Sequence, residues 1–445
     1  MLLPIRAVTK TEKILSRFFF TRRLMSSGDH RKTEVYSFGD SSQGALGHPY
    51  LLTQDAYTPE SVGKLPEDVV SIAAGHYHSL AVTSQGHLWA WGRNEEAQLG
   101  QDEPVPRNEW QFPRRVKGLD DVKVSAAFAS GVVSAAIGDG GSLWVWGKSK
   151  RGQLGLGDGV TEATLPCRVE ALAGEKIAKV SFGWGHALAQ TQDGKLFGWG
   201  YTADGRIGRL GGAATASPLD SGLDVVKGDQ QSSGSRLEVA ERLVLGIEKE
   251  KDMPTVWNPS LVEELHGVEV TDIACGLDHS LVLCRDGTLL SAGSNVYGQL
   301  GRVNRDLGLF PVDIRFCPLS VASGLGHSLA ICRISSDGDV REIVSWGWNQ
   351  LSQLGRSGPA NTPLEVEGLL GETPISVSGG RVHTIALTAE DVWVWGCGKN
   401  GRLGLGSSTD EAEPFPLDWT GEVLQVVSGF DHSLILVARE DYETI

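Results

Sequence analysis

The chain has 445 residues, and 40% of them are hydrophobic, which is enough for a large buried core. Its net charge of −15 argues against a broad nucleic-acid-binding surface, because phosphate backbones are held mainly by Lys and Arg. The six cysteines show no Cys-x-x-Cys spacing, so we expect reduced thiols rather than a metal site or a disulfide framework. No apolar run reaches the roughly 18 residues that a membrane span needs.

The first 28 residues differ in charge from the rest of the chain. They carry six basic side chains and one acidic one, a net charge of +5, so residues 29–445 carry −20. Ile14, Leu15 and Phe18 can share one face of a helix. This composition is typical of a mitochondrial transit peptide over 1–28 and predicts a matrix protein. The alternative is a basic tail on a nuclear or cytosolic protein.

From residue 35 onward, one sequence motif occurs seven times. It reads VYSFGDSSQGALG at 35–47 and LWAWGRNEEAQLG at 88–100. Further copies stand at 143–155, 196–208, 289–301, 343–355 and 392–404. The copies follow one another at about 50 residues, except for one interval of 93 residues between the fourth and the fifth. A regular period of this length indicates a repeat architecture.

The other half of each unit is a Gly-x-x-His turn between two short apolar segments. Its histidines are His78, His186, His279, His327, His383 and His432. The copy at 124–137 has lost the histidine, and Val133 stands there. Short segments rich in Val, Ile, Leu and Trp that are bounded by glycines indicate β-strands.

We therefore predict an all-β fold, a seven-bladed β-propeller over residues 35–438 followed by a short tail, 439–445. One large aromatic per unit should fill the wedge between adjacent sheets. The residues at this position are Trp91, Trp146, Trp199, Trp346 and Trp395, with Phe38 and Ala292 as substitutes. The first and last strands each lack partners within their own unit. We expect them to share one blade and so close the ring.

The long interval contains an insert at about 209–257. Ser235 and Glu238 there form a Ser-x-x-Glu capping box, which predicts the start of a helix. Four apolar residues follow helical spacing on one face of it. They are Leu237, Ala240, Val244 and Ile247. This face could dock a partner or pack on the propeller itself, and the sequence leaves both open.

The Trp-Gly, Gln-Leu-Gly and Gly-x-x-His-Ser elements resemble the repeats of the regulator of chromosome condensation family. The resemblance covers about 35–438 and implies a seven-bladed propeller. The family includes a nuclear exchange factor for a GTPase, a plant UV-B photoreceptor and organellar proteins of RNA metabolism or ribosome assembly. The transit-like segment favours the organellar branch. The resemblance to its plant mitochondrial member implies a non-enzymatic scaffold for intron splicing of a complex I subunit transcript. A guanine-nucleotide exchange factor and a mitochondrial ribosome assembly factor are the alternatives.

The sequence offers no catalytic, metal-binding or cofactor-binding constellation. The six histidines recur once per unit, so they cannot converge on one substrate, and we expect each to fix its own turn by bonding to the backbone. The variable residues inside the turns are better candidates for an interaction surface, by resemblance to the photoreceptor's cluster at one mouth of the propeller. They are Tyr77, Trp184, Asp278, Arg381, Phe430 and Asp431. They could equally be solvated loop residues. We expect protein partners, including RNA-binding splicing factors, and leave direct RNA contact open.

Overall fold

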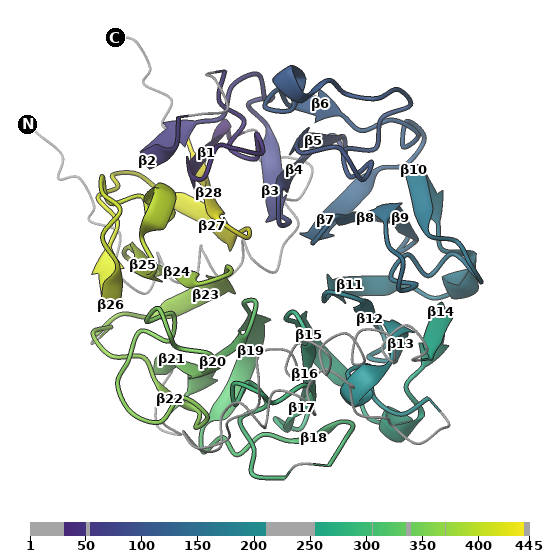
Figure 1. Cartoon of the computed structure of the whole chain (residues 1–445), viewed down its shortest axis with the longest axis vertical. Helices are drawn as coiled ribbons and strands as arrows, with labels where there is room; N and C mark the ends of the chain where they lie inside the picture. The colour runs from purple at the N-terminus through teal and green to yellow at the C-terminus, as the bar shows by residue number, and fades with distance from the viewer. Residues whose placement is uncertain are drawn as a thin grey trace, which may run out of the picture.

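The computed structural model describes residues 31–49, 54–210, 254–304, 306–334, 340–369 and 371–439. These residues form seven four-stranded antiparallel sheets arranged as blades around a central axis (Figure 1). The seven-bladed β-propeller predicted from the repeat is therefore confirmed. We number the blades in chain order, from blade 1, which contains β1.

The four strands of each blade follow one another from the axis outward. Blade 1 comprises β27 (Val423–Ser428), β28 (His432–Ala438), β1 (Thr33–Gly39) and β2 (Ala56–Ser61). Blade 2 comprises β3 (Val69–Ala74), β4 (His78–Thr83), β5 (Leu88–Gly92) and β6 (Arg114–Arg115). Blade 3 comprises β7 (Val124–Ser130), β8 (Val133–Gly138), β9 (Leu143–Lys148) and β10 (Glu162–Arg168). Blade 4 comprises β11 (Ile177–Phe182), β12 (His186–Thr191), β13 (Leu196–Tyr201) and β14 (Thr255–Leu261).

The remaining blades follow the same order. Blade 5 comprises β15 (Val270–Cys275), β16 (His279–Cys284), β17 (Leu289–Gly293) and β18 (Phe310–Pro311). Blade 6 comprises β19 (Cys317–Ser323), β20 (His327–Arg333), β21 (Arg341–Gly347) and β22 (Leu364–Glu365). Blade 7 comprises β23 (Pro374–Gly379), β24 (His383–Thr388), β25 (Val392–Gly396) and β26 (Glu411–Pro416). Short 3₁₀ turns lie at Arg107–Glu109, Glu170–Leu172, Ala203–Gly205, Glu263–Leu265 and Lys399–Gly401.

Blade 1 closes the ring by joining the two ends of the chain, as the sequence predicted. Strand β1 pairs with β28 without a break in register, from Thr33 opposite Ala438 to Gly39 opposite His432. Figure 1 shows the purple N-terminal strands beside the yellow C-terminal ones. This pairing matters because an unpaired strand at either end would leave exposed backbone donors and acceptors.

The interfaces between blades form the core. The second strands β4, β8, β16 and β24 are buried at every residue, because both faces of each blade pack against neighbours. The five tryptophans of the repeat are fully buried, as are Phe38 and Ala292 at the equivalent position. Ala292 is too small to fill the place that a ring takes in the other blades. Leu309 belongs to the same apolar cluster, and its Cδ1 faces Gly208, where the other blades place an aromatic ring.

The insert lies in blade 4, between β13 and β14, which pair through Gly200 opposite Val256. Residues 211–253 lie outside the described residues. The predicted helix face formed by Leu237, Ala240, Val244 and Ile247 therefore has no structural account, and the same holds for the transit-like segment 1–28 and for 440–445. In the described part of the chain, all six cysteines are free, and Cys167 and Cys317 are exposed.

Candidate binding face at the channel mouth

The inner strands of all seven blades line a central channel with a volume of about 450 Å³. The turns between the first and second strands lie together at one mouth of this channel. The first variable residue of each turn lines the mouth, and Trp184, Arg381 and Phe430 are among them. Backbone bonds run from turn to turn around the mouth. They join Trp184 N to Leu277 O, Leu277 N to Leu325 O, Leu325 N to Gly380 O, Arg381 N to Phe430 O, Phe430 N to Gly75 O and His76 N to Gly131 O.

The six repeated histidines join neighbouring blades. Each Nε2 lies 2.7–3.1 Å from a hydroxyl oxygen of the next blade around the ring. The pairs are His432–Ser79, His78–Ser134, His186–Ser280, His279–Ser328, His327–Thr384 and His383–Ser433. The sequence analysis predicted that each histidine bonds to the backbone of its own turn, and this prediction was wrong. The ring packs so tightly against the glycine of its turn that a Cβ on Gly183 would overlap His186 Cε1.

The hydrogen-bond chain at each interface fixes the state of the histidine. The hydroxyl donates to a backbone carbonyl of the preceding blade, as Ser328 Oγ does to Gln299 O at 2.8 Å. The hydroxyl hydrogen is thereby used, so the histidine must donate through Nε2–H. Its lowered pKa keeps the ring neutral at neutral pH. Burial lowers the pKa of His78, His279 and His327 to about 3 and that of His432 to about 4. Burial also lowers the pKa of His186 and His383 well below the ordinary value of 6.5.

The tryptophans use the same carbonyls. Trp146 Nε1 donates to Gln98 O at 2.9 Å, the oxygen that also accepts from Ser134 Oγ. Trp91, Trp199, Trp346 and Trp395 make the equivalent bond to Ala45, Gln153, Gln299 and Gln353. The repeated tryptophan therefore fills the wedge and also satisfies a buried acceptor of the neighbouring blade.

The interface between blades 3 and 4 is built differently. Val133 replaces the histidine of blade 3, and Ala187 replaces the hydroxyl residue of blade 4, so both partners are absent at one interface. Within the described residues, it is also the only interface without a turn-to-turn backbone bond at the mouth. Gln153 crosses it instead, with its side-chain Nε2 donating to Gly183 O at 2.5 Å.

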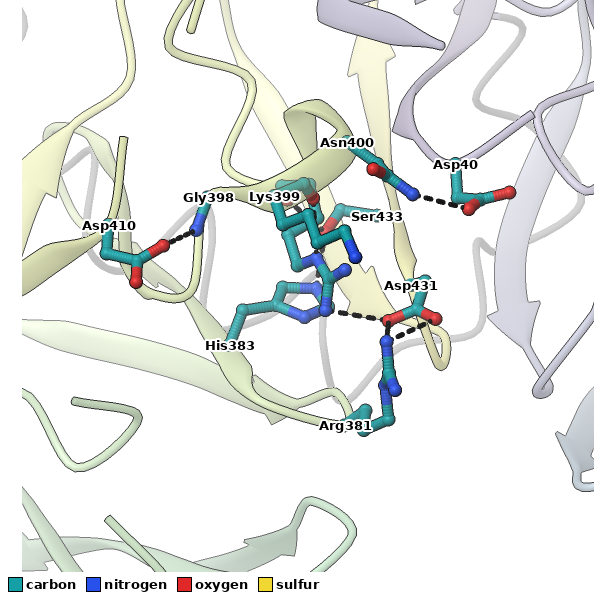
Figure 2. Close-up of polar contacts among 10 residues, drawn as sticks. Asp40, Arg381, His383, Gly398, Lys399, Asn400, Asp410, Asp431 and Ser433 are labelled. Carbon is teal, nitrogen blue, oxygen red and sulfur yellow. Dashed lines mark hydrogen bonds and ion pairs between the residues drawn. The ribbon is translucent and has the colours of Figure 1, made fainter. Parts of the chain in front are cut away.

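Asp278 and Asp431 are held by buried arginines of the preceding blades. Arg206 of blade 4 lies 2.6 Å from Asp278 and 3.0 Å from Asp204. Arg402 of blade 7 lies 2.7 Å from Asp431, which also accepts a bidentate pair from Arg381 at 2.7–2.9 Å (Figure 2). These carboxylates therefore tie blades together, and much of their hydrogen-bonding capacity is used within the chain.

The two arginine–aspartate interfaces are the ones that lack the tryptophan. Blade 5 carries Ala292 and blade 1 carries Phe38 at the tryptophan position, so neither supplies an indole N–H to the preceding blade. At these interfaces, Arg206 or Arg402 occupies the position directly before the Ile-Gly or Leu-Gly pair of one blade. Asp278 or Asp431 occupies the turn of the next blade. An ion pair between a buried arginine and a partly exposed aspartate therefore stands where the indole hydrogen bond is absent.

At the mouth, aromatic rings from three blades lie near one another, and Arg381 covers one of them. His76 lies 4.4 Å from Phe430 and 6.3 Å from Trp184 between ring centroids, and Tyr77 lies 5.7 Å from Phe430. The Arg381 guanidinium lies 4.8 Å above the Phe430 ring. Trp184 is 51% exposed. We call these five residues the mouth cluster.

The mouth cluster contains four of the six side chains that the sequence singled out, namely Tyr77, Trp184, Arg381 and Phe430. Asp431 adjoins it through Arg381, whereas Asp278 lies in blade 5 against Arg206. Sequence reasoning missed His76, because the repeat drew attention to the histidine two residues later. A signal existed: the first variable position of the turn also holds Trp184 and Phe430, so a third ring there could have been noticed.

A closed ring of seven four-stranded blades, tied together by repeated Trp and His side chains, defines a β-propeller of RCC1-type repeats. No helix within the described ranges is long and apolar enough to cross a membrane. The RCC1-like domain model matches residues 34–435, and the chain belongs to that family.

Several known proteins are similar to this chain. The ultraviolet-B receptor UVR8 of Arabidopsis thaliana is 28% identical over 389 residues, 85% of this chain and 76% of the receptor. The RCC1 domain-containing protein RUG3, mitochondrial, of Arabidopsis thaliana is 32% identical over 386 residues, 82% of this chain and 75% of RUG3. The secretion-regulating guanine nucleotide exchange factor of Mus musculus is 31% identical over 316 residues, 68% of this chain and 62% of that protein.

Among solved structures, yeast RCC1 (Prp20), crystallised with Kap60 bound, superposes with a TM-score of 0.72 at 20% identity. The superposition covers 95% of this chain and 92% of that one. At this identity, the likeness establishes the shared fold alone.

Proposed function

We propose that this protein is a non-enzymatic adaptor of the mitochondrial matrix that supports the processing of organellar RNA. Its specific task in this proposal is intron splicing of a complex I subunit transcript. The similarity to the mitochondrial RUG3 protein and the basic, acid-poor segment 1–28 support the compartment. The resemblance to the organellar branch of the family supports the RNA task.

The mouth cluster is the observation that carries an adaptor role. Aromatic and arginine side chains are the commonest anchors of protein interfaces, and Trp184 presents half of its surface to solvent beside them. The charge of −20 over residues 29–445 disfavours a strong grip on RNA itself. It favours basic protein partners, among which RNA-binding splicing factors are the class we propose.

The proposal is tested by complementing cells that lack the protein. The variants are Trp184→Ala at the mouth and Phe415→Ala on the outer strand of blade 7, whose side chains are 51% and 49% exposed. We expect loss of the protein to reduce spliced complex I transcripts, Phe415→Ala to restore them and Trp184→Ala to restore them poorly. Unchanged splicing in cells without the protein would refute the RNA task. A fusion of residues 1–40 that stays outside mitochondria would refute the compartment.

The exchange-factor alternative is supported by the similarity to the mouse secretion-regulating exchange factor. It predicts that the purified protein accelerates release of a fluorescent guanine nucleotide from a small GTPase. The ribosome-assembly alternative predicts altered sedimentation of mitochondrial ribosomal subunits with splicing intact. Nucleotide release by the propeller, or a ribosome defect without a splicing defect, would replace the splicing proposal.

A further inference from the structure

A groove with a volume of about 590 Å³ lies between blades 5 and 6, outside the mouth cluster. Segments 295–298, 347–350 and 360–361 line it, together with Arg302. It opens on the same face as the mouth, because the Trp348 N–H donates to Gly326 O in the turn of blade 6. The groove is therefore a second feature of the candidate binding face.

Two aromatic rings form one side of the groove. The centroids of Tyr297 and Trp348 lie 5.5 Å apart, with their planes tilted by 32°. Tyr297 is 42% exposed, and Trp348 is partly buried. Both pack against Gly326, where a Cβ would come within 3.2 Å of the Trp348 Cβ and 3.6 Å of the Tyr297 ring. The glycine thus lets the two rings sit side by side at the rim.

Two amide side chains of the groove, those of Asn295 and Asn349, present hydrogen-bond donors rather than acceptors. Asn295 Oδ1 accepts the Leu300 N–H at 3.0 Å, and Asn349 Oδ1 accepts the Leu354 N–H at 3.0 Å. These bonds use the amide oxygens within their own loops. Their Nδ2 groups remain to bind a ligand, so a ligand rich in hydrogen-bond acceptors fits at these two positions.

The groove offers no charge for an ionic ligand. Arg302 is the one charged side chain among its lining residues, and its guanidinium is used inside the chain. It donates to Ser291 Oγ and to the carbonyl oxygens of Asn304, Asp306 and Gly308. A nucleic acid or an acidic peptide would find no free cation among these lining residues, so charge complementarity favours an uncharged occupant.

We propose that this groove binds a proline-rich segment of a partner protein in the polyproline II conformation. Proline has no backbone N–H, so such a segment offers carbonyl acceptors and no donors, which matches the free amide groups. Its flat rings pack on neighbouring aromatic side chains, and its backbone is already extended, which lowers the entropic cost of binding. The proposal concerns a ligand class and holds whichever compartment or RNA task the protein has.

The test is a fluorescence anisotropy titration of the full chain with a labelled ten-residue polyproline peptide. A ten-residue Gly-Ser peptide is the ligand control. Tyr297→Ala removes the exposed ring. The double variant Asn295→Asp/Asn349→Asp keeps an oxygen for each loop N–H and removes both free donors. Phe415→Ala, which removes an exposed aromatic ring on the outer strand of blade 7, is the matched control.

We expect saturable binding of polyproline, at least about tenfold weaker binding by each groove variant and unchanged binding by Phe415→Ala. Unchanged thermal midpoints would show that the groove variants are folded. Equal binding of the Gly-Ser peptide would overturn the proposal, and so would wild-type affinity in both groove variants. An uncharged oligosaccharide that binds while polyproline does not would assign the groove to another ligand and also overturn it.

Discussion

Mild acid should unfold this propeller, because its blade interfaces depend on neutral histidines. Burial holds the pKa of His78, His279 and His327 at about 3 and that of His432 at about 4. In the unfolded chain, the same groups return to about 6.5. The unfolded state therefore binds more protons than the folded state between these values. The stability that the histidines contribute is complete above pH 6.5 and is lost as the pH falls towards 3.

The size of the effect follows from those pKa values. At pH 5, each of the four histidines favours unfolding by about 2 kcal/mol relative to neutral pH, which gives about 8 kcal/mol together. This is comparable to the whole unfolding free energy of a typical domain, roughly 5–15 kcal/mol. The pKa values of His186 and His383 are lowered in the same direction and add to the loss. We expect the folded state to fail between about pH 5 and pH 4.

The assay is urea unfolding followed by tryptophan fluorescence at several pH values from 7.5 to 5. Near pH 5, the unfolding free energy should fall by at least about 5 kcal/mol per pH unit, the slope for the four protons of His78, His279, His327 and His432. His279→Gln is the control, because it retains an N–H donor and removes one titrating group. It should reduce that slope by about 1.4 kcal/mol per pH unit. An unfolding free energy that stays constant between pH 7 and pH 5 would refute the reasoning.

Three further predictions concern single interfaces, and urea unfolding at pH 7.5 measures each of them. Ser328→Ala leaves a buried histidine N–H without its acceptor and should cost about 2 kcal/mol; a cost near zero would contradict the bond. Val133→His with Ala187→Ser should rebuild the missing link, with a favourable coupling of about 1 kcal/mol in a double-mutant cycle, whereas strict additivity would show that it does not form. Asp278→Asn removes one carboxylate from buried Arg206 and should cost about 2–4 kcal/mol, against under about 1 kcal/mol for a fully exposed ion pair.

The fold could be predicted because the same sequence motif occurs seven times. Each copy places an aromatic residue, a glycine and apolar strands at the same spacing, and a period near 50 residues matches four short strands. Ring closure followed from the strands left without partners at the two ends. Side-chain partners were harder to predict, because a bond such as His78–Ser134 joins residues 56 positions apart in different copies.

The sequence did contain a signal for those partners. In five copies, a serine or threonine follows the histidine directly, and each hydroxyl serves the histidine of the copy before it. The two exceptions stand in consecutive copies of the turn: Val133 lacks the histidine and Ala187 lacks the hydroxyl. An interface that has lost both partners suggests that they work as a pair. The same comparison would have linked Arg206 to Asp278 and Arg402 to Asp431.

The interfaces also indicate where partner recognition should be sought on this face. The second variable residues Asp278 and Asp431 face the preceding blade, and each forms an ion pair with an arginine there. Substituting such a residue changes stability and binding together, so a defect there says little about a partner. The ring of Trp184 at the mouth is 51% exposed and takes no part in the histidine, tryptophan or arginine links between blades. Because this ring can be removed with those links intact, Trp184 is the position where partner binding should be lost while the unfolding free energy stays nearly unchanged.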